Sequence, residues 1–493
     1  MKQPLQVVFL VAALGAQTSA AQPDFERNAA PVRPAPADPS IARALASIDA
    51  SRIEKTIGTL VDFATRNSLT SMETGLPPGQ GAQAAADWIA AQFEETSKQC
   101  GGCLEVNRDV FTADPASGAS WAGRVPRPTK MTNIYAILRG ADPAQAGRMV
   151  LVTGHYDSIN SNAFKNWADT SGAAPGANDD ASGVAVSLEC ARALSKLRFP
   201  ATIVFVAVDG EEEGLIGSAH LAHLARERGW QLEAVLNNDI VGGNTTPGDK
   251  LQLKDRVRVF SEGVPSAAAP EEARRIRALG EENDSPSREL ARAIDDVAHA
   301  YFAAGSSSGP AANFDAFQAF LVFRPDRYGR GGDHSSFNHE GYAAVRFTEW
   351  REDYNHQHQN VVRPTAGSDE PVKGDLPEFV DFNYVARVAR LNAATLATLA
   401  SAPGEPEKVT METGRQELST TLHWNAPGGA PAGMHYELLW RETTAPEWQY
   451  VQAIQPEAPG AAVTVTVPMS KDNVIFGVRA VDAAGHRSVA VAP

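Results

Sequence analysis

The strongest constraint on the fold is an apolar run that ends in three consecutive glutamates. Residues 203–208 have the β-branched and aromatic character of a buried strand, and a glycine-flanked turn follows that carries Glu211, Glu212 and Glu213. Adjacent carboxylates at a buried strand end repel one another unless protons or cations compensate their charge. Because open α/β sheets bind ligands at the carboxyl ends of their strands, this segment predicts a metal enzyme.

Apolar strands alternate with helical segments over most of the chain. Strands are expected at residues 149–153, 202–208 and 234–238, and helices follow the first two of them. This alternation implies crossover connections, and it predicts an α/β fold in which helices sandwich a mostly parallel mixed sheet. From residue 408 on, short alternating strands with turn signals predict a small all-β sandwich domain.

The composition changes along the chain and divides its 493 residues into five stretches. The first begins with Lys2, continues with an apolar core and ends in small residues, which is the pattern of a cleaved signal peptide. It predicts a secreted or periplasmic protein, and its apolar run is too short for a membrane anchor. The five expected stretches are a signal peptide at 1–21, a flexible Pro/Ala-rich segment at 22–39, the α/β domain at 40–400, a linker at 401–407 and the β-sandwich at 408–493.

The charge of the chain limits its partners. The formal net charge is −15 and the pI is about 5.3, which argues against nucleic acid as a partner because phosphate binding needs a basic surface. After the N-terminal stretch, the sequence contains no segment that is long and apolar enough to cross a membrane. We therefore expect a well-solvated soluble protein.

The three cysteines fit an exported protein. Cys100-Gly-Gly-Cys103 is expected to close a small disulfide loop in an oxidising compartment. A thioredoxin-like redox pair would need a strand-to-helix context, and a zinc ribbon would need a second cysteine pair. Cys190 lies in a helical segment rich in Ala and Leu, where we expect a buried apolar residue.

Five potential metal ligands follow strand ends along the chain: His155, Asp179, Glu212, Asp239 and either His356 or His358. Imidazole and carboxylate groups suit zinc, with manganese or cobalt as substitutes. Three carboxylates and one bridging hydroxide balance the charge of two Zn²⁺ ions, so two zinc ions per chain are expected. Each residue alone has an ordinary alternative, such as a helix cap or a turn. Their order after successive strands favours the metal site.

Several motifs resemble those of known families. The segments Gly154–Asp157, Ala177–Gly183, Glu211-Glu212, Asn238-Asp239 and Asp333-His334 resemble the co-catalytic di-zinc aminopeptidases of the bacterial leucyl aminopeptidase type. That family also includes relatives of glutamate carboxypeptidase and glutaminyl cyclase, and the resemblance spans roughly residues 80–400. Near the C-terminus, the segments Leu422–Trp424, Tyr436–Arg441 and Phe476–Asp482 resemble a fibronectin type III domain.

The resemblance implies a role for each ligand position. His155 and Asp239 would hold the first zinc ion, and Asp179 would bridge both ions with its two oxygens. Glu212 and a late histidine would hold the second ion. His356 is preferred as this histidine, since Asn360 then takes the place of the family's usual aspartate, and His358 is the alternative.

The residues beside the ligands would assist the reaction. Glu211 looks like the general base, and Asp157 would accept the other ring N–H of His155 and fix its tautomer. Asp180 would orient the bridging carboxylate, while Glu213 is expected to face solvent. Asp333 and His334, with the following Ser335, resemble a supporting loop rather than ligands.

These features predict an exported zinc metallo-exopeptidase that hydrolyses the N-terminal bond of peptides or proteins. A metal-bridged hydroxide would attack the carbonyl with Glu211 as base. A carboxypeptidase is an alternative that Arg324, Arg327 and Arg330 keep open, and a one-zinc glutaminyl cyclase is another. A third is an inactive binding protein. Whether the protein is an enzyme or a binding protein, the C-terminal domain would attach it to a surface or polymer.

Overall fold

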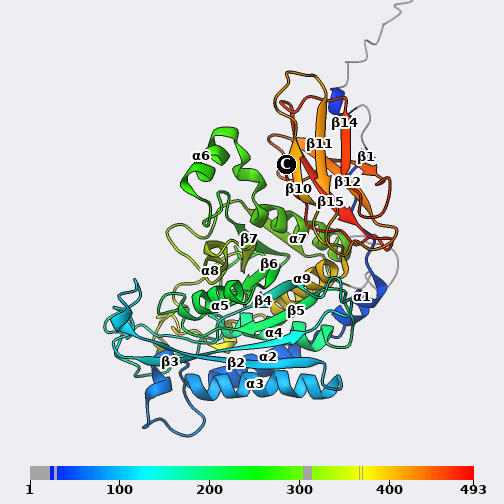
Figure 1. Ribbon diagram of the computed structural model, residues 1–493. Helices are drawn as coiled ribbons and strands as arrows, with labels where there is room; N and C mark the ends of the chain where they lie inside the picture. Colours follow the sequence, from blue (N-terminus) through cyan, green and yellow to red (C-terminus); the bar gives the residue numbers. More distant parts are fainter. Residues whose placement is uncertain (1–22, 27–29, 304–313, 366, 369) are drawn as a thin grey trace, which may run out of the picture.

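The computed structural model describes residues 23–26, 30–303, 314–365, 367–368 and 370–493. The expected signal peptide lies outside the described residues. Figure 1 shows a large α/β domain and, beside it, a smaller domain built from strands. Among the described residues, no helix combines the length and the apolar character needed to cross a membrane.

The α/β domain is built on a mixed sheet. Within the described residues its order is β2-β3-β5-β4-β6-β9-β7-β8. The central strands β5, β4, β6 and β9 are parallel, whereas β2 and β3 are antiparallel at one edge, and the parallel pair β7 and β8 runs opposite to β9 at the other. The bounds are β2 Leu104–Ala113, β3 Thr129–Leu138, β4 Arg148–Thr153, β5 Thr202–Ala207, β6 Gln231–Asn238, β7 Arg256–Ser261, β8 Gln318–Val322 and β9 Ala344–Thr348.

Helices cover both faces of this sheet because its central strands are apolar on both sides. In β4, Val150 and Val152 pack with one large core, whereas Met149 and Leu151 pack with a second core on the opposite face. Helices α1, α2, α3, α4, α7 and α9 contribute to the first core, and α5 and α8 to the second. The prediction of a mostly parallel mixed sheet between helices is therefore confirmed.

The helix bounds follow the chain order. The α-helices are α1 Pro39–Leu45, α2 Ala50–Asp62, α3 Ala82–Gln99, α4 Ala181–Leu194, α5 Ile216–Glu227, α6 Pro270–Leu279, α7 Pro286–Phe302, α8 His334–His339 and α9 Phe382–Ser401. Short 3-10 helices are η1 Asp24–Glu26, η2 Ser68–Met72, η3 Pro115–Ser117, η4 Glu281–Asp284 and η6 Pro377–Phe379. Helix α6 stands away from the sheet in Figure 1. A disulfide joins Cys100 to Cys103 just after α3, and Cys190 is buried in α4.

The C-terminal domain consists of strands that form two sheets in the described part of the chain, β1-β13-β12-β15 and β10-β11-β14. Trp424, Tyr436 and Trp440 lie between them in a common core. The prediction of an all-β domain is confirmed, and its resemblance to a fibronectin type III domain stays a prediction. The bounds are β1 Ala30–Pro31, β10 Glu407–Met411, β11 Thr420–Asn425, β12 His435–Glu442, β13 Tyr450–Ile454, β14 Val463–Val467 and β15 Val474–Val481.

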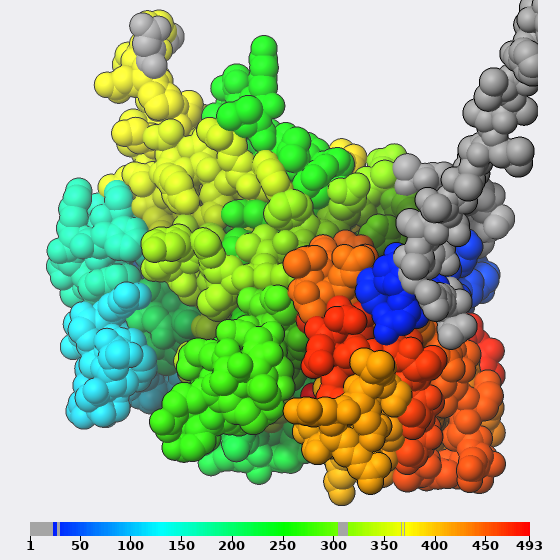
Figure 2. All heavy atoms as spheres, turned by 90° about the horizontal axis from the view of Figure 1, so that it is seen from above, coloured from blue at the N-terminus to red at the C-terminus, as the bar shows by residue number. Residues whose placement is uncertain are grey.

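The N-terminal segment, which was expected to be flexible, contains a short strand. Its strand β1 pairs antiparallel with β13, and the indole N–H of Trp440 donates to the carbonyl of Phe25 at 2.9 Å. Figure 2 shows the blue N-terminal segment lying against the orange and red C-terminal domain. Proline is tolerated here because β1 is an edge strand, where a missing N–H breaks no ladder. Composition alone did not predict this strand pairing.

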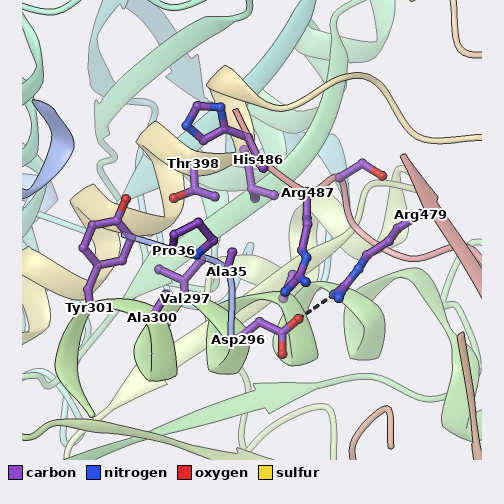
Figure 3. Close-up of a pocket in the computed structure, with 14 residues that line it drawn as sticks. Ala35, Pro36, Asp296, Val297, Ala300, Tyr301, Thr398, Arg479, His486 and Arg487 are labelled. Carbon is purple, nitrogen blue, oxygen red and sulfur yellow. Dashed lines mark hydrogen bonds and ion pairs between the residues drawn. The ribbon is translucent and has the colours of Figure 1, made fainter. Parts of the chain in front are cut away.

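Ion pairs fix the two domains against each other. The guanidinium of Arg479 on β15 lies 2.6 Å from Glu437 and 2.5 Å from Asp296 on α7. Figure 3 shows Arg479 reaching Asp296, with Pro36 of the N-terminal segment close by. The indole of Trp448 also donates to Glu289 Oε2 at 2.9 Å. The C-terminal domain is thus docked on the helical layer of the α/β domain.

The central sheet predicts a clear stability effect. Leu236 on β6 is 0% exposed, so Leu236→Ala should lower the free energy of unfolding by about 2–5 kcal/mol through lost contacts and a residual cavity. Leu279, which ends α6, is 63% exposed, and Leu279→Ala should change that free energy by less than about 0.5 kcal/mol. Denaturant unfolding measures both variants, and equal losses would contradict this assignment of the core.

Candidate metal centre

The predicted ligands converge at the carboxyl edge of the parallel strands. His155 follows β4, Glu212 follows β5 and Asp239 follows β6 directly. Asp179 comes from the loop before α4, and its Oδ1 lies 3.1 Å from His155 Nε2. The Oδ1 atom of Asp239 is 3.9 Å from the same nitrogen. Parallel strands bring these side chains together because their carboxyl ends share one edge.

Asp179 has one carboxylate oxygen near His155 and the other near His358. Its Oδ2 atom lies 2.8 Å from His358 Nε2, and Glu212 Oε1 lies 2.8 Å from the same nitrogen. In the part of the chain that the structure describes, the two groups that could each hold a metal ion are His155, Glu211 and Asp239 on one side and Asp179, Glu212 and His358 on the other. Asp179 therefore offers one oxygen to each side.

The donor atoms fit metal ions. His155 Nε2, Glu212 Oε1 and His358 Nε2 are buried, and none forms a well-oriented hydrogen bond with any described residue. Such buried atoms are costly to leave without a partner. Imidazole nitrogen and carboxylate oxygen are the ligands that zinc accepts in hydrolytic sites. Two divalent ions would satisfy the unpaired atoms and compensate the carboxylates.

The preference for His356 over His358 is wrong. The His356 ring stacks on Phe379 with centroids 3.6 Å apart, and its Nδ1 faces Asp353 at 3.9 Å. His358 adopts a left-handed backbone conformation with φ 54°, and its ring lies in the site. The side-chain amide of Asn360 donates to Asn162 Oδ1, so Asn360 does not take the position expected for the family's aspartate. Residue spacing could not reveal this turn, because spacing along the sequence does not show which residue has a positive φ.

Asp157 joins two strand ends. Its Oδ1 lies 3.4 Å from His155 Nδ1, the ring nitrogen turned away from the other ligands. The same carboxylate accepts the backbone N–H groups of Glu211 at 3.2 Å and Glu212 at 3.1 Å. The backbone carbonyl of Asp157 also lies 3.2 Å from His155 Nδ1. Asp157 thus faces the His155 ring and holds the turn that carries both glutamates.

Asp180 positions the backbone of the site. Its Oδ1 accepts the N–H of Gly183 at 2.9 Å and caps α4, while its Oδ2 accepts the N–H of His155 at 3.1 Å. A Cβ on Gly154 would lie 2.6 Å from the Gly183 carbonyl carbon. The helix can approach the strand end closely only because both positions are glycine.

Glu213 is buried, and the expectation that it faces solvent is wrong. Its exposure is 0%, and Ser68 Oγ donates to its Oε2 at 3.0 Å. Burial raises the pKa of Glu213 well above its usual value, and the charge of Asp157 adds to the rise. The third glutamate therefore packs beneath the turn on the side of η2.

Two buried residues that the sequence analysis missed support the ligands. Arg346 Nη2 lies 2.9 Å from Asp239 Oδ1, and its Nη1 lies 3.3 Å from Asp326. Asp375 accepts the backbone N–H of Asp179 at 2.7 Å and of the preceding residue at 2.8 Å. A lone arginine inside the apolar strand β9 was an available signal, since buried arginines are almost always paired. The sequence around Asp375 carries no comparable signal.

The segment expected to form a supporting loop lies beside the two groups. Burial raises the pKa of Asp333 to about 7. His334 faces the carbonyl of Pro325 through Nε2 at 2.7 Å. Among the described residues, neither side chain belongs to one of the two ligand groups, and the supporting role of this segment stays a prediction.

The negative charge of the site governs its histidines. Burial lowers the pKa of His155, but Asp157 and Asp179 outweigh this effect and raise the pKa well above its usual value. Burial also lowers the pKa of His358, but Glu212 and Asp179 outweigh this effect and raise the pKa well above its usual value. The surrounding carboxylates therefore favour the protonated form of both imidazoles. A metal ion must displace these protons to bind.

The fold and the site define an α/β protein that presents metal-ligand groups at its strand ends. The model of Peptidase family M28 matches residues 133–367. A probable zinc metalloprotease of Pyricularia oryzae is 42% identical over 92% of this chain and 84% of its own length. Another, of Leptosphaeria maculans, is 40% identical over 94% of this chain and 98% of its own length. The chain belongs to Peptidase family M28, which confirms the predicted family resemblance.

One solved structure matches about three quarters of the chain. It is the LapA aminopeptidase of Legionella pneumophila, which is 19% identical and has a TM-score of 0.45. The match covers 73% of this chain and 74% of that one.

Two histidine variants test the ligand assignment. His358→Ala should weaken the binding of one Zn²⁺ ion. The loss of affinity should exceed the roughly 10–100-fold loss that is typical when a residue hydrogen-bonded to a metal ligand is removed. His356→Ala should keep the metal content of the wild type, because that ring stacks on Phe379. Elemental analysis after dialysis against a metal buffer measures both. Loss of metal in the His356 variant alone would contradict the assignment.

Metal binding should depend on pH with a defined sign. Protons on His155 and His358 compete with the metal, so Zn²⁺ affinity should rise as pH increases from 6 to 8 and protons should be released on binding. Calorimetric titration in buffers of different ionisation enthalpy measures the number of released protons. Proton uptake, or affinity that is constant over this range, would contradict the charge states assigned here.

Proposed function

We propose that the protein is an exported zinc-dependent aminopeptidase that holds two Zn²⁺ ions per chain. The observation that carries this proposal is the position of Asp179 between two groups, each of which contains a histidine. Membership of Peptidase family M28 supports peptide hydrolysis, and the relatives described as probable zinc metalloproteases support zinc as the metal. A one-zinc glutaminyl cyclase would not need both groups.

The ligand shell divides into clear roles. His155 and Asp239 would hold one ion, Glu212 and His358 the other, and Asp179 would contact both. When bound, zinc supplies the positive charge that polarises the peptide carbonyl and stabilises the oxyanion of the transition state. Arg346 and Asp375 support this shell, because they fix Asp239 and the backbone of Asp179.

Glu211 would move the proton. Its backbone N–H is held by Asp157, and its carboxylate belongs to the group of His155 and Asp239. Burial raises the pKa of Glu211 well above its usual value, and the charge of Asp239 adds to the rise. A carboxylate with a raised pKa can take a proton from the attacking water and deliver it to the leaving amine. The amine then leaves as a neutral group.

The charges around the site favour an amino-terminal over a carboxy-terminal substrate end. A substrate α-ammonium group is attracted by the surrounding carboxylates. A substrate α-carboxylate would need a free guanidinium, but Arg327 and Arg330 both pair with Glu352, at 2.8 and 3.1 Å. Two of the three arginines that kept carboxypeptidase action open are therefore engaged, and the third, Arg324, stacks over Tyr328. The carboxylates around the site thus make aminopeptidase action the better supported of the two.

Export is part of the proposal. The N-terminal sequence has the pattern of a signal peptide, and the Cys100–Cys103 disulfide suits an oxidising compartment. Peptides or proteins outside the cytoplasm are the proposed substrates. Attachment to a surface or polymer is the proposed role of the C-terminal domain.

The proposal predicts a metal-dependent activity that needs Glu211 and a free amino terminus. Glu211→Gln should lower kcat on an aminoacyl nitroanilide by about 10²–10⁴-fold through loss of proton transfer, while both zinc ions stay bound. Glu227→Gln, at a side chain 63% exposed on α5, is the matched control and should keep full activity. A chelator should abolish the activity and Zn²⁺ should restore it.

Three outcomes would contradict the proposal. Equal cleavage of N-acetylated and unblocked peptides would indicate an endopeptidase. A single tightly bound zinc ion with cyclisation of N-terminal glutamine would indicate a glutaminyl cyclase. Absence of turnover with zinc fully loaded would indicate a binding protein.

A further inference from the structure

The strand pair β7 and β8, with β8 at the edge of the sheet, presents one uncovered face. Val257, Val259 and Ala319 point into the large core that α7 helps to form. On these strands, the alternate residues Arg258 and Phe320 lie on the opposite face, where Phe320 is 41% exposed. Successive residues of a strand point to opposite faces, so a row of arginine and aromatic side chains follows from the strand periodicity.

Loops extend this face into a groove. A hollow of about 860 Å³ lies over the segment 350–355, and a second hollow of about 730 Å³ lies over β7 and β8. Both are lined by Leu251, Arg258, Trp350, Arg351, Glu352 and Tyr354, and we call the combined surface the edge groove. Tyr354 is 63% exposed, and Tyr328 at its far end is 89% exposed. Large aromatic side chains gathered on an exposed surface mark binding sites.

The edge groove carries a small excess of positive charge, because Lys250, Arg258, Arg324, Arg327 and Arg351 line it together with the carboxylates Asp249, Glu352 and Asp353. Arg351 pairs with Asp249 at 3.1 Å. Arg258, Arg327 and Arg330 all pair with one carboxylate, that of Glu352, at distances between 2.8 and 3.1 Å. Arg324 stacks 5.4 Å over the ring of Tyr328 and forms no ion pair with a carboxylate of the described chain. On a protein with a net charge of −15, this local cationic surface attracts acidic segments.

The edge groove reaches the metal centre through Glu352. This residue lines the groove and also a small internal cavity that Asp179 lines from the other side. Arg330, which pairs with Glu352 at 3.1 Å, is exposed. Its charge interacts with both Asp179 and Asp239. The buried side chain of Glu352 thus lies between the groove and the cavity that Asp179 lines.

We propose that the edge groove binds the part of a peptide substrate that follows the scissile bond, and that it favours acidic and aromatic residues there. This inference rests on the proposed aminopeptidase function. The substrate of an aminopeptidase has a single residue before the scissile bond, so an extended groove that leads from the site can hold only the residues after it. The free guanidinium of Arg324 and the exposed aromatic rings match acidic and aromatic side chains.

Matched hexapeptides test the preference. Leu-Ala-Asp-Asp-Phe-Gly and Leu-Ala-Lys-Lys-Phe-Gly share their first two residues and differ in downstream charge. We expect kcat/KM for leucine release to be at least about tenfold higher for the acidic peptide at low salt, mainly through KM, with a smaller ratio at 1 M salt because of screening. Equal kcat/KM values for the two peptides would overturn the proposal.

Charge reversal localises the effect. The double variant Arg324→Glu and Arg351→Glu should reduce the ratio of acidic to basic peptide to about one or below. Lys250→Glu, which also lies on the groove, should reduce it in the same direction and serves if the double variant does not fold. Arg415→Glu, 78% exposed in the C-terminal domain, is the matched control and should keep the ratio of the wild type. An unchanged ratio in the groove variants would overturn the proposal.

Binding without turnover separates this inference from the proposed function. Calorimetry with the zinc-loaded Glu211→Gln variant should show tighter binding of the acidic hexapeptide, and the groove variants should lose this difference. If the wild type releases no leucine but the preference persists in binding, the aminopeptidase function fails while the groove assignment holds. If leucine is released without any charge preference, the groove assignment fails and the function holds.

Discussion

The site depends on the carboxylate of Asp157, which ties the end of one strand to the turn after the next. It faces the His155 ring and accepts both N–H groups of the Glu211-Glu212 turn. Buried carboxylates are stabilised when backbone donors surround them. This contact fixes the distance between a metal-ligand histidine, a second ligand and the proposed base before any metal binds.

The parallel centre of the sheet turns this anchor into a full site. Strands β4, β5 and β6 end at one edge, so side chains distant in the sequence meet there. Close contact of α4 with β4, which Gly154 and Gly183 allow, brings Asp179 between the two ligand groups. Arg346 then offsets part of the negative charge through its ion pair with Asp239. The metal centre is therefore a product of topology as much as of its ligands.

The sequence predicted the features that depend on local pattern and missed those that depend on backbone turns. Apolar periodicity was enough for the α/β sheet, and the strand-end motifs were enough to bring His155, Asp179, Glu212 and Asp239 together. His358 was misjudged because its own backbone has a left-handed conformation, which the sequence does not show. Glu213 was misjudged because nothing local shows which side of a turn packs on η2. The edge groove was not predicted, since its loops are separated by about a hundred residues.

The docked N-terminal segment has a consequence for the order of assembly. Strand β1 at residues 30–31 pairs with residues 450–451, so one of the earliest parts of the chain contacts one of the latest. During synthesis, the first segment has no partner until nearly the whole chain has emerged. It then closes over the C-terminal domain and leads into α1 of the α/β domain. A cut in the linker near residue 404 would therefore leave the two domains joined through β1 and their ion pairs.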